Sequence, residues 1–312
     1  MEEIMQSLEA IKRKMGSTES LRSIVKTMKI LAAVSIRQHE KMLRSLEEFN
    51  KTLEMGLQVV LKSYEKKEKK QIKAVDNLRT AAVVFGSDMG MCGQFNETIS
   101  AFAAENMKRY KNNITVVMAV GEKVMARLDD HGFKPQEFLS FPATLTAGID
   151  PILQELIFKI EKWRENLEVD KVMLYYNKPA GEMLSYSPYV HELLPVSEGY
   201  LDSLREKKWV SVTMPVFKMD RDDLFDSLIR NHLYVSLYRS FVASLTSENA
   251  ARMASMEAAE RHINDRLDEL KRIYNEERQD QITSELLDII AGFETLTLPR
   301  FREKDARHWR GF

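Results

Sequence analysis

The chain has 312 residues, of which 44% are hydrophobic and 30% are charged, with 46 basic and 47 acidic side chains. A formal net charge of −1 excludes a global field that would recruit nucleic acid or an anionic membrane. The single cysteine excludes an internal disulfide, and the absence of a signal peptide pattern or a long apolar run predicts a cytosolic or peripherally membrane-bound chain of about two structural units.

Glycine and proline mark the architecture, because they interrupt helices. Before Gly86 the only glycines are Gly16 and Gly56, and the stretch between Pro215 and Gly292 contains neither residue type. Most of the interruptions therefore fall between residues 86 and 215. This distribution predicts a long N-terminal helix, a central mixed domain and a long C-terminal helix.

The N-terminal segment carries apolar residues three and four positions apart, which is the spacing of a coiled-coil seam. We expect the seam to resume after Gly16 and to hold polar Ser35 and Gln38 in its middle. A strongly charged stretch, residues 64–73, joins this helix to the central domain. The predicted seam consists of Ile4, Leu8, Ile11, Met15, Leu21, Ile24, Met28, Leu31, Met42, Leu46, Phe49 and Leu53.

In the central segment, short β-rich runs alternate with helical ones. This order predicts a mostly parallel, Rossmann-like α/β sheet with helices on its faces. The run 186–194 contains Pro188 and is expected to be an edge strand, where proline is tolerated. The predicted strands are 80–85, 114–120, 172–176 and 186–194, and the predicted helices are 97–110, 122–128 and 153–163.

A glycine-rich segment, residues 86–96, follows the first predicted strand and precedes a helix, which is the context of a phosphate-binding turn. The spacing of Gly86, Gly90 and Gly93 does not match G-x-G-x-x-G, and no P-loop lysine follows. The helix start could activate Cys92 as a nucleophile, but no histidine lies near it in the sequence to act as its base. A structural strand-to-helix turn is favoured, and a small enzyme that uses Cys92 is the alternative.

The histidines are scattered singly, without the paired spacing of zinc ligands. We therefore predict no catalytic residue, no metal site and no cofactor in this chain. The histidines are His39, His131, His191, His232, His262 and His308.

The C-terminal segment carries two apolar stripes separated by the polar run 275–281. As one helix, residues 221–296 would be about 110 Å long, so this helix needs a partner, and the N-terminal helix is the candidate. Because the C-terminal helix is the longer one, part of it should find apolar cover in another protein. The first stripe is Met253, Met256, Ile263, Leu267, Leu270 and Tyr274, and the second is Ile282, Leu286, Ile289, Phe293 and Leu296.

Three segments resemble, in the same order, the gamma subunit of F-type ATP synthases. Residues 24–33 with Arg37 resemble the N-terminal signature of that family, and residues 87–96 are similar to its Ser-Asp-(Arg/Lys)-Gly-Leu-Cys-Gly segment. Residues 247–259, with matching positions between 274 and 292, resemble its C-terminal helix. Met89 and Met91 replace the usual basic residue and leucine, which indicates a divergent branch.

The resemblance implies an α/β fold class with an antiparallel coiled coil of long terminal helices and a central mostly parallel domain. The implied divisions are the N-terminal helix with its connector (1–73), the α/β domain (74–215), the C-terminal helix (216–296) and a tail (297–312). The implied function is that of a central rotor shaft, which does no chemistry itself and couples ion flow through a membrane ring to ATP synthesis or hydrolysis. The alternative is a non-rotary coiled-coil scaffold that presents an α/β module.

The resemblance also implies partners and contact residues. The partners are the alpha and beta subunits of a catalytic hexamer, a small central-stalk accessory subunit and the ring subunits, without nucleic acid, at the cytoplasmic face of the cell membrane. Pro299 is expected to end the helix, and the basic and aromatic tail beyond it is either regulatory or disordered. The implied hexamer contacts are Met28, Lys29, Arg278, Gln279, Thr283 and Glu285, and the residues implied for an apolar sleeve are Ile289, Ile290 and Phe293.

Overall fold

The computed structural model describes residues 2–63, 78–110, 113–140, 149–181, 185–209, 213 and 215–305, with side chains from residue 8 to residue 294. The chain divides into two compact units, Met28–Met256 and a second unit made of Met1–Thr27 with Glu257–Phe312. Two long helices, α1 (Glu2–Ser63) and α6 (Arg221–Asp305), contribute to both units. The predicted connector 64–73 lies outside the described residues.

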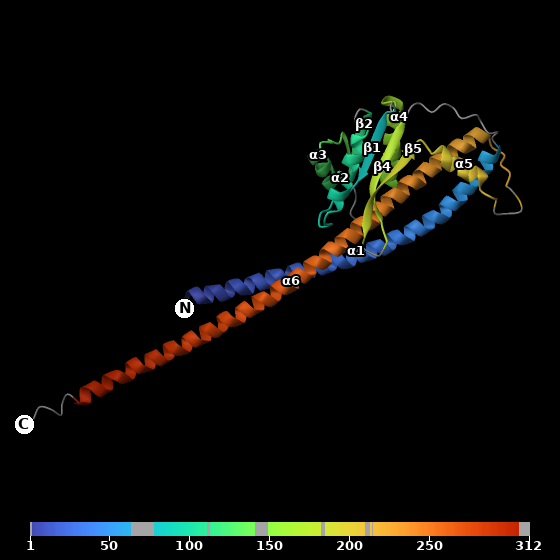
Figure 1. Ribbon diagram of the computed structural model, residues 1–312. Coiled ribbons are helices and arrows are strands. Elements are labelled where there is room, and N and C mark those ends of the chain that lie inside the picture. Colours follow the sequence, from blue (N-terminus) through green and yellow to red (C-terminus); the bar gives the residue numbers. More distant parts are fainter. Residues whose placement is uncertain are drawn as a thin grey trace, which may run out of the picture. The chain divides into compact units, whose positions relative to one another are not determined.

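A five-stranded sheet with the order β3-β2-β1-β4-β5 forms the centre of the Met28–Met256 unit (Figure 1). Strand β1 (Thr80–Phe85) pairs in parallel with β2 (Ile114–Val120) and β4 (Lys171–Pro179), and β2 pairs in parallel with the short β3 (Glu137–Leu139). Strand β5 (Tyr186–Leu194) is antiparallel to β4 and lies at the sheet edge, with Pro188 opposite Asn177. The mostly parallel sheet and its edge strand are therefore confirmed.

Helices cover both faces of this sheet. On one face, α2 (Phe95–Lys108) and α3 (Glu122–Asp130) pack on the alternate β1 residues Ala82 and Val84. On the other face, α4 (Asp150–Asn166) and part of α6 pack on Ala81, Val83 and Phe85. Because both faces are covered, every residue of β1 is buried, as is typical of a central parallel strand.

One stretch of α6 belongs to the core of the α/β domain. Every residue from 240 to 252 is buried, and Leu237, Val242 and Leu245 belong to the same apolar cluster as the sheet. The Phe241 ring lies 5.8 Å from the Phe85 ring at an interplanar angle of 89°, which is a favourable edge-to-face arrangement. The helix and the sheet therefore cannot separate without exposing this core to water.

The part of α1 in this unit runs antiparallel to α6. Residues 42–49 of α1 line a groove with Tyr234 and Tyr238 of α6, whereas Gly56 lies against Leu228, whose Cδ2 atom would be 3.2 Å from an added Cβ. The residue numbers thus rise along one helix as they fall along the other. Helix α5 (Glu198–Glu206) covers the end of the pair, where Leu204 packs against Leu57 and Leu61.

The predicted seam of α1 is wrong in its middle. From Met15 the half-buried positions continue in three- and four-residue steps through Thr18, Arg22 and Val25, because α1 passes Gly16 without a break and keeps its phase. The polar residues Thr18 and Arg22 therefore belong to the half-buried stripe, in place of the predicted Leu21 and Ile24. The predicted seam residues Leu21, Ile24, Leu31 and Phe49 are 53%, 56%, 61% and 50% exposed.

In the second unit, the segments of α1 and α6 each bury one stripe, as expected for helices packed through an apolar seam. On α6 Leu267 and Leu270 are buried, and on α1 Leu8, Ile11 and Met15 are half-buried. The first predicted stripe of α6 is thus confirmed.

The far end of α6 differs from the prediction in length. The helix runs to Asp305 and is not ended by Pro299. A proline removes one hydrogen bond and crowds the preceding turn, but turns on both sides can carry the helix across it. The rest of the predicted tail, residues 306–312, lies outside the described residues.

Gly86 offers a test of the packing between β1 and α3. An added Cβ would lie 2.3 Å from Val124 Cβ and 2.8 Å from Asn96 Oδ1, and Val124 Cβ cannot move without its helix. We expect Gly86→Ala to lower the free energy of unfolding by about 2 to 3 kcal/mol. In Gly90→Ala the new Cβ meets nothing within 4 Å, so this control should change it by less than about 0.5 kcal/mol. Urea denaturation of the purified chain measures both, and equal values would contradict the packing.

Candidate functional site

The glycine-rich segment forms a tight turn that its own side chains fill. The Gly86 N–H donates to Val120 O at 2.8 Å. The Ser87 N–H donates to Asn96 Oδ1 at 2.9 Å, and Asn96 Nδ2 donates to Ser87 Oγ at 2.8 Å. This reciprocal pair ties the end of β1 to the first turn of α2. The Asn96 side chain thus occupies the place that a ligand of a phosphate-binding turn would need.

Asp88 connects the same turn to the next helix. Its Oδ1 accepts the Glu122 N–H at 2.7 Å, at the first residue of α3, and its Oδ2 accepts the Ser140 hydroxyl at 2.8 Å. A carboxylate at a helix N-terminus is favourable, because it satisfies a free N–H and meets the positive end of the helix dipole. Asp88 therefore has a structural role in the turn.

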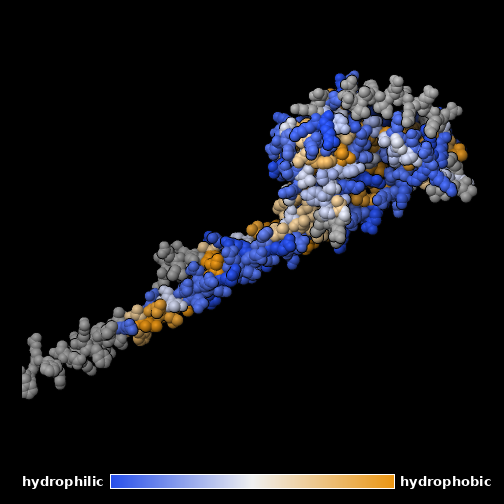
Figure 2. Space-filling model, in the orientation of Figure 1, coloured by the Kyte–Doolittle hydropathy of each residue, from blue (hydrophilic) through white to orange (hydrophobic). Residues whose placement is uncertain are grey.

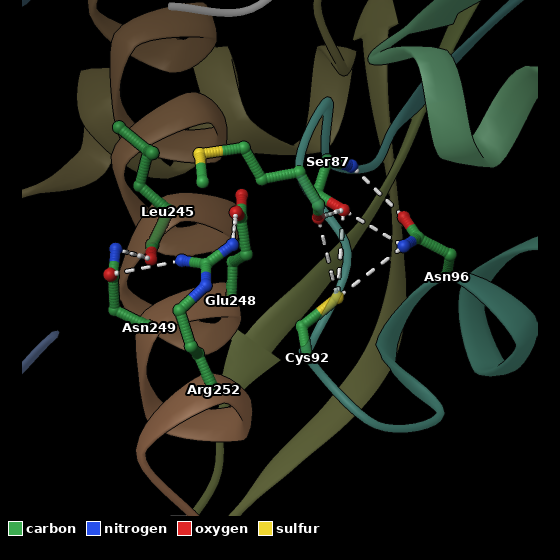
Figure 3. Close-up of polar contacts among 8 residues, drawn as sticks. Ser87, Cys92, Asn96, Leu245, Glu248, Asn249 and Arg252 are labelled. Carbon is green, nitrogen blue, oxygen red and sulfur yellow. Dashed lines mark hydrogen bonds and ion pairs between the residues drawn. The ribbon is translucent and has the colours of Figure 1, made fainter. Parts of the chain in front are cut away.

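Cys92 lies inside the turn, beside Ser87 and Asn96, and is only 2% exposed. Its Sγ lies 3.5 Å from Asn96 Nδ2 and 3.6 Å from Ser87 Oγ, as Figure 3 shows. Burial raises the pKa of the thiol above its ordinary value, which is the opposite of what a nucleophile requires. The geometry thus favours the structural turn over the alternative of a Cys92 enzyme.

The turn packs directly on α6. Cys92 and Phe95 form one apolar cluster with Ala251, and Gly93, at φ +57°, comes so close that an added Cβ would lie 2.9 Å from Ser255 Oγ. Only glycine combines this backbone conformation with such a close approach at little cost. Glycine at position 93 therefore allows the turn to pack closely against α6.

A chain of hydrogen bonds links the turn, the sheet and α6. Asn177, at the end of β4, donates through Nδ2 to Phe95 O at 3.0 Å. Ser247 of α6 in turn donates through Oγ to Asn177 O at 3.0 Å. All three residues are buried, where a satisfied polar contact specifies one arrangement and an unsatisfied one is costly.

An ion pair lies within the buried part of α6. Arg252 donates to Glu248 one helical turn earlier, and its other terminal nitrogen lies 3.3 Å from Asn249 Oδ1 (Figure 3). The two side chains are 7% and 11% exposed for Glu248 and Arg252. Burial raises the pKa of Glu248, and Arg252 opposes that rise. The guanidinium therefore partly offsets the cost of burying the Glu248 carboxyl group beside the turn.

The histidines do not gather into a metal site. Among the residues that the structure describes, no group of three or more His, Cys, Asp or Glu side chains is placed to hold a metal ion. His39 is buried, and burial lowers its pKa to about 4. His131 lies 3.1 Å from Glu97 Oε1, and His308 lies outside the described residues.

The residues expected to contact a hexamer come from two helices, α1 and α6. Met28 and Lys29 are half-buried on α1. The polar residues of α6 are exposed, with Thr283 Oγ1 donating to Gln279 O at 2.9 Å and Glu285 Oε1 accepting from Gln281 at 3.0 Å. Arg278 is exposed as well. Nothing in the described chain gives these side chains a catalytic geometry.

The second apolar stripe of α6 is exposed. Figure 2 shows apolar surface close to the C-terminal end of the described side chains. The described side chains of the stripe are far more exposed than those of Leu267 and Leu270, which are 3% and 4% exposed. Its described members are Ile282 at 48%, Leu286 at 56%, Ile289 at 59% and Phe293 at 70% exposed, and the adjacent Leu287 and Ile290 are 60% and 55% exposed. The side chain of the remaining predicted member, Leu296, lies outside the described residues.

Comparison with known proteins identifies the family. A sequence model described as ATP synthase matches residues 7–296. The chain belongs to the ATP synthase family. The ATP synthase gamma chain of Haemophilus influenzae (strain 86-028NP) is 29% identical over 296 residues, covering 92% of this chain and 99% of that relative. The gamma chain of Pasteurella multocida (strain Pm70) is 28% identical over 292 residues, with the same coverage.

Solved structures share the fold. A chain of the Euglena gracilis mitochondrial ATP synthase OSCP/F1/c-ring structure has a TM-score of 0.63 at 17% identity, covering 95% of this chain and 96% of that one. A chain of the Tetrahymena thermophila mitochondrial ATP synthase central stalk and c-ring has a TM-score of 0.52 at 22% identity, covering 76% and 99%. Among the described helices of this family member, none is long and apolar enough to cross a membrane.

The ion pair between Glu248 and Arg252 should contribute to the stability of the folded chain. We expect Arg252→Met to lower the free energy of unfolding by about 3 kcal/mol at pH 8, because it leaves a buried carboxylate without its partner. Adding Glu248→Gln should restore about half of the loss, since it removes the orphaned charge.

The effect of Arg252→Met on stability should depend on pH, because the pKa of Glu248 is raised in the folded chain. A carboxyl group whose pKa is raised in the folded state costs stability as the pH rises above its ordinary value of 4.5. The loss in Arg252→Met should therefore be smaller at pH 5 than at pH 8, as measured by urea denaturation. A pH-independent loss would show that Glu248 is not the cause.

Proposed function

We propose that this chain is the gamma subunit of a rotary ATP synthase, the central shaft that couples rotation of a membrane ring to ATP synthesis or hydrolysis in an alpha/beta hexamer. The observation that carries the proposal is α6. One stretch of this helix is part of the core of the α/β domain, and a later stretch presents an exposed apolar stripe. Residues 240–252 would fix α6 to the domain, and the exposed residues from Ile282 to Phe293 would contact the surrounding subunits. This arrangement suits a shaft that turns together with its domain.

The shaft itself is proposed to be non-catalytic. The raised pKa and burial of Cys92 and the filled glycine-rich turn support this assignment. The chemistry then belongs to the partners, and the shaft acts by contacting each of them differently as it turns. Such coupling requires contacts that differ between conformations of the partner. The proposed location is peripheral, at the cytoplasmic face of the cell membrane.

Two sets of residues are proposed to meet the hexamer. Exposure of the polar side chains on α6 supports contact through Arg278, Gln279, Thr283 and Glu285, and Met28 and Lys29 are proposed for the contact on α1. Ile289, Ile290 and Phe293 are proposed to run in an apolar sleeve, because burial of a large aliphatic or aromatic side chain is worth about 1.5 to 3 kcal/mol. The remaining proposed partners are the ring subunits and a small accessory subunit.

Reconstitution tests the proposal directly. The chain would be co-expressed with the alpha and beta subunits of its own source, and ATP hydrolysis measured on complexes purified with and without it. We expect one copy per hexamer and hydrolysis that depends on its presence. A chain that forms stable complexes without the catalytic subunits, and leaves turnover unchanged when they are present, would instead be a scaffold.

The apolar sleeve makes a separate prediction. Ile289 and Ile290 are already exposed in the chain alone, so Ile289→Asp with Ile290→Asp should change its free energy of unfolding by less than about 0.5 kcal/mol. In the complex the same pair should reduce assembly or ATP synthesis at least about tenfold, because two carboxylates would be desolvated. Asp288→Asn, a neighbouring exposed position, is the control. Normal synthesis by the double variant would contradict the sleeve.

A further inference from the structure

A pocket of about 370 Å³ lies in the Met28–Met256 unit, away from the glycine-rich turn. Side chains from five elements line it, with Glu54 on α1, Lys178 on β4, His191 on β5, Tyr200 on α5 and Arg239 on α6. His232, also on α6, stacks on the Tyr200 ring at a centroid distance of 5.0 Å and an interplanar angle of 24°. The function proposed for the shaft does not use this pocket.

The charges around the pocket do not balance. Glu54 has its own cation, Lys207, at 3.4 Å. Glu192 is paired with Lys171 at 2.7 Å. Neither of these lysines lines the pocket, so the acids are neutralised from outside it.

The two cations that do line the pocket have no such partner. Within the described chain, neither a hydrogen bond nor an ion pair joins Arg239 to another residue, and Lys178 only lies over the Tyr189 ring at 5.4 Å. Two positive charges therefore remain available to a ligand.

The histidines add two further groups that respond to an anion. Burial lowers the pKa of His191, with Arg239 as the next cause, and burial also lowers the pKa of His232, with His191 as the next cause. His232 Nδ1 is buried without a hydrogen-bond partner in the part of the chain that the structure describes. Burial and the Arg239 charge thus both disfavour protonation of these rings, and a bound anion would favour it.

We propose that this pocket binds a small phosphate-class dianion, held by the Arg239 guanidinium and the Lys178 ammonium with the two histidines as further donors. A dianion balances both unpaired cations, whereas a single carboxylate balances only one. The planar guanidinium matches two oxygens of a phosphate at once, which makes it the strongest contact in such a site. The volume leaves room for a small organic phosphate with a group packed against the tyrosines.

Titration of the full chain with inorganic phosphate, and separately with sulfate, tests the site. Isothermal titration calorimetry and thermal unfolding would be run against sodium chloride at equal ionic strength. We expect saturable binding of both dianions and a Tm that rises with their concentration, as ligand linkage requires. Equal effects of chloride would show general screening, and equal binding of acetate would show a carboxylate site, and either result overturns the proposal.

Variants of Arg239 locate the binding. Arg239→Gln should weaken sulfate binding at least about tenfold, because it removes a charge-assisted bidentate contact, and Arg239→Lys should retain part of the affinity. Arg230→Gln is the matched control, since Arg230 is exposed on the same helix and does not line the pocket. Equal affinity of Arg239→Gln and the wild-type chain would rule out the site.

The pH dependence provides an independent measurement. Sulfate stays a dianion between pH 6 and pH 8, so any change in its affinity comes from the protein. The titratable and charged groups facing the histidines are Glu54, Glu192, Lys178, Arg239, Tyr176, Tyr189 and Tyr200. Because only His191 and His232 have ordinary pKa values near this range, we expect binding about three-fold tighter at pH 6. His232→Phe keeps the stacked ring and should flatten the dependence, and an unchanged profile in His191→Phe and His232→Phe would remove the histidines from the site.

Discussion

The structure of the Met28–Met256 unit depends on the burial of one stretch of α6 in the core of the α/β domain. Residues 240–252 are buried on every side, and Phe241 packs on Phe85 of the central strand. A helix that is buried all round needs small or apolar residues on every face, and the sequence here is rich in alanine and serine. Because the sheet supplies one wall of this burial and the glycine-rich turn supplies another, the turn and the helix specify each other. Gly86 and Gly93 are then packing residues, although they lie between a strand and a helix, the context of a phosphate-binding turn.

Buried polar groups fix the position of α6 relative to the sheet and the glycine-rich turn. The hydrogen bonds from Asn177 to Phe95 O and from Ser247 to Asn177 O run through the interior, and the Glu248–Arg252 pair lies beside them. Apolar contacts alone would allow α6 to slide by one turn at modest cost, because leucine and alanine surfaces resemble one another. Buried hydrogen bonds do not allow this, since each shift would leave donors and acceptors unpaired. The buried hydrogen bonds thus fix the register between the domain and α6, as the proposed rotor function requires.

Much of the fold follows from the sequence pattern, and the failures have physical causes. Strands 80–85, 114–120 and 186–194 agree with their predicted bounds. Strands 80–85 and 114–120 are buried runs rich in β-branched residues, which are distinctive between turn signals. Strand β3, with three residues, is too short for any alternation to show. The seam of α1 departs from the prediction at Leu21, because the half-buried stripe keeps its helical phase through Thr18 and Arg22 although both are polar. Of the site, the turn was predictable, but the pocket around Arg239 was not, since its residues come from separate elements that only the tertiary fold brings together.

Helix α6 passes through three environments in order, and its sequence changes with each of them. It is buried on all sides over residues 240–252, buried on one stripe as far as Leu270, and exposed along an apolar stripe from Ile282 to Phe293. The α/β domain covers the first stretch of α6, and α1 covers the stripe of the second stretch. Along the third stretch the described apolar side chains are exposed, although an exposed apolar stripe of this length is costly in water. Covering that stripe on one side only would fix the helix to one partner, whereas a surrounding apolar sleeve covers it at every angle. This stretch of α6 is therefore consistent with the proposed sleeve, because only a partner that encircles the helix would cover the stripe at every angle of the proposed rotation.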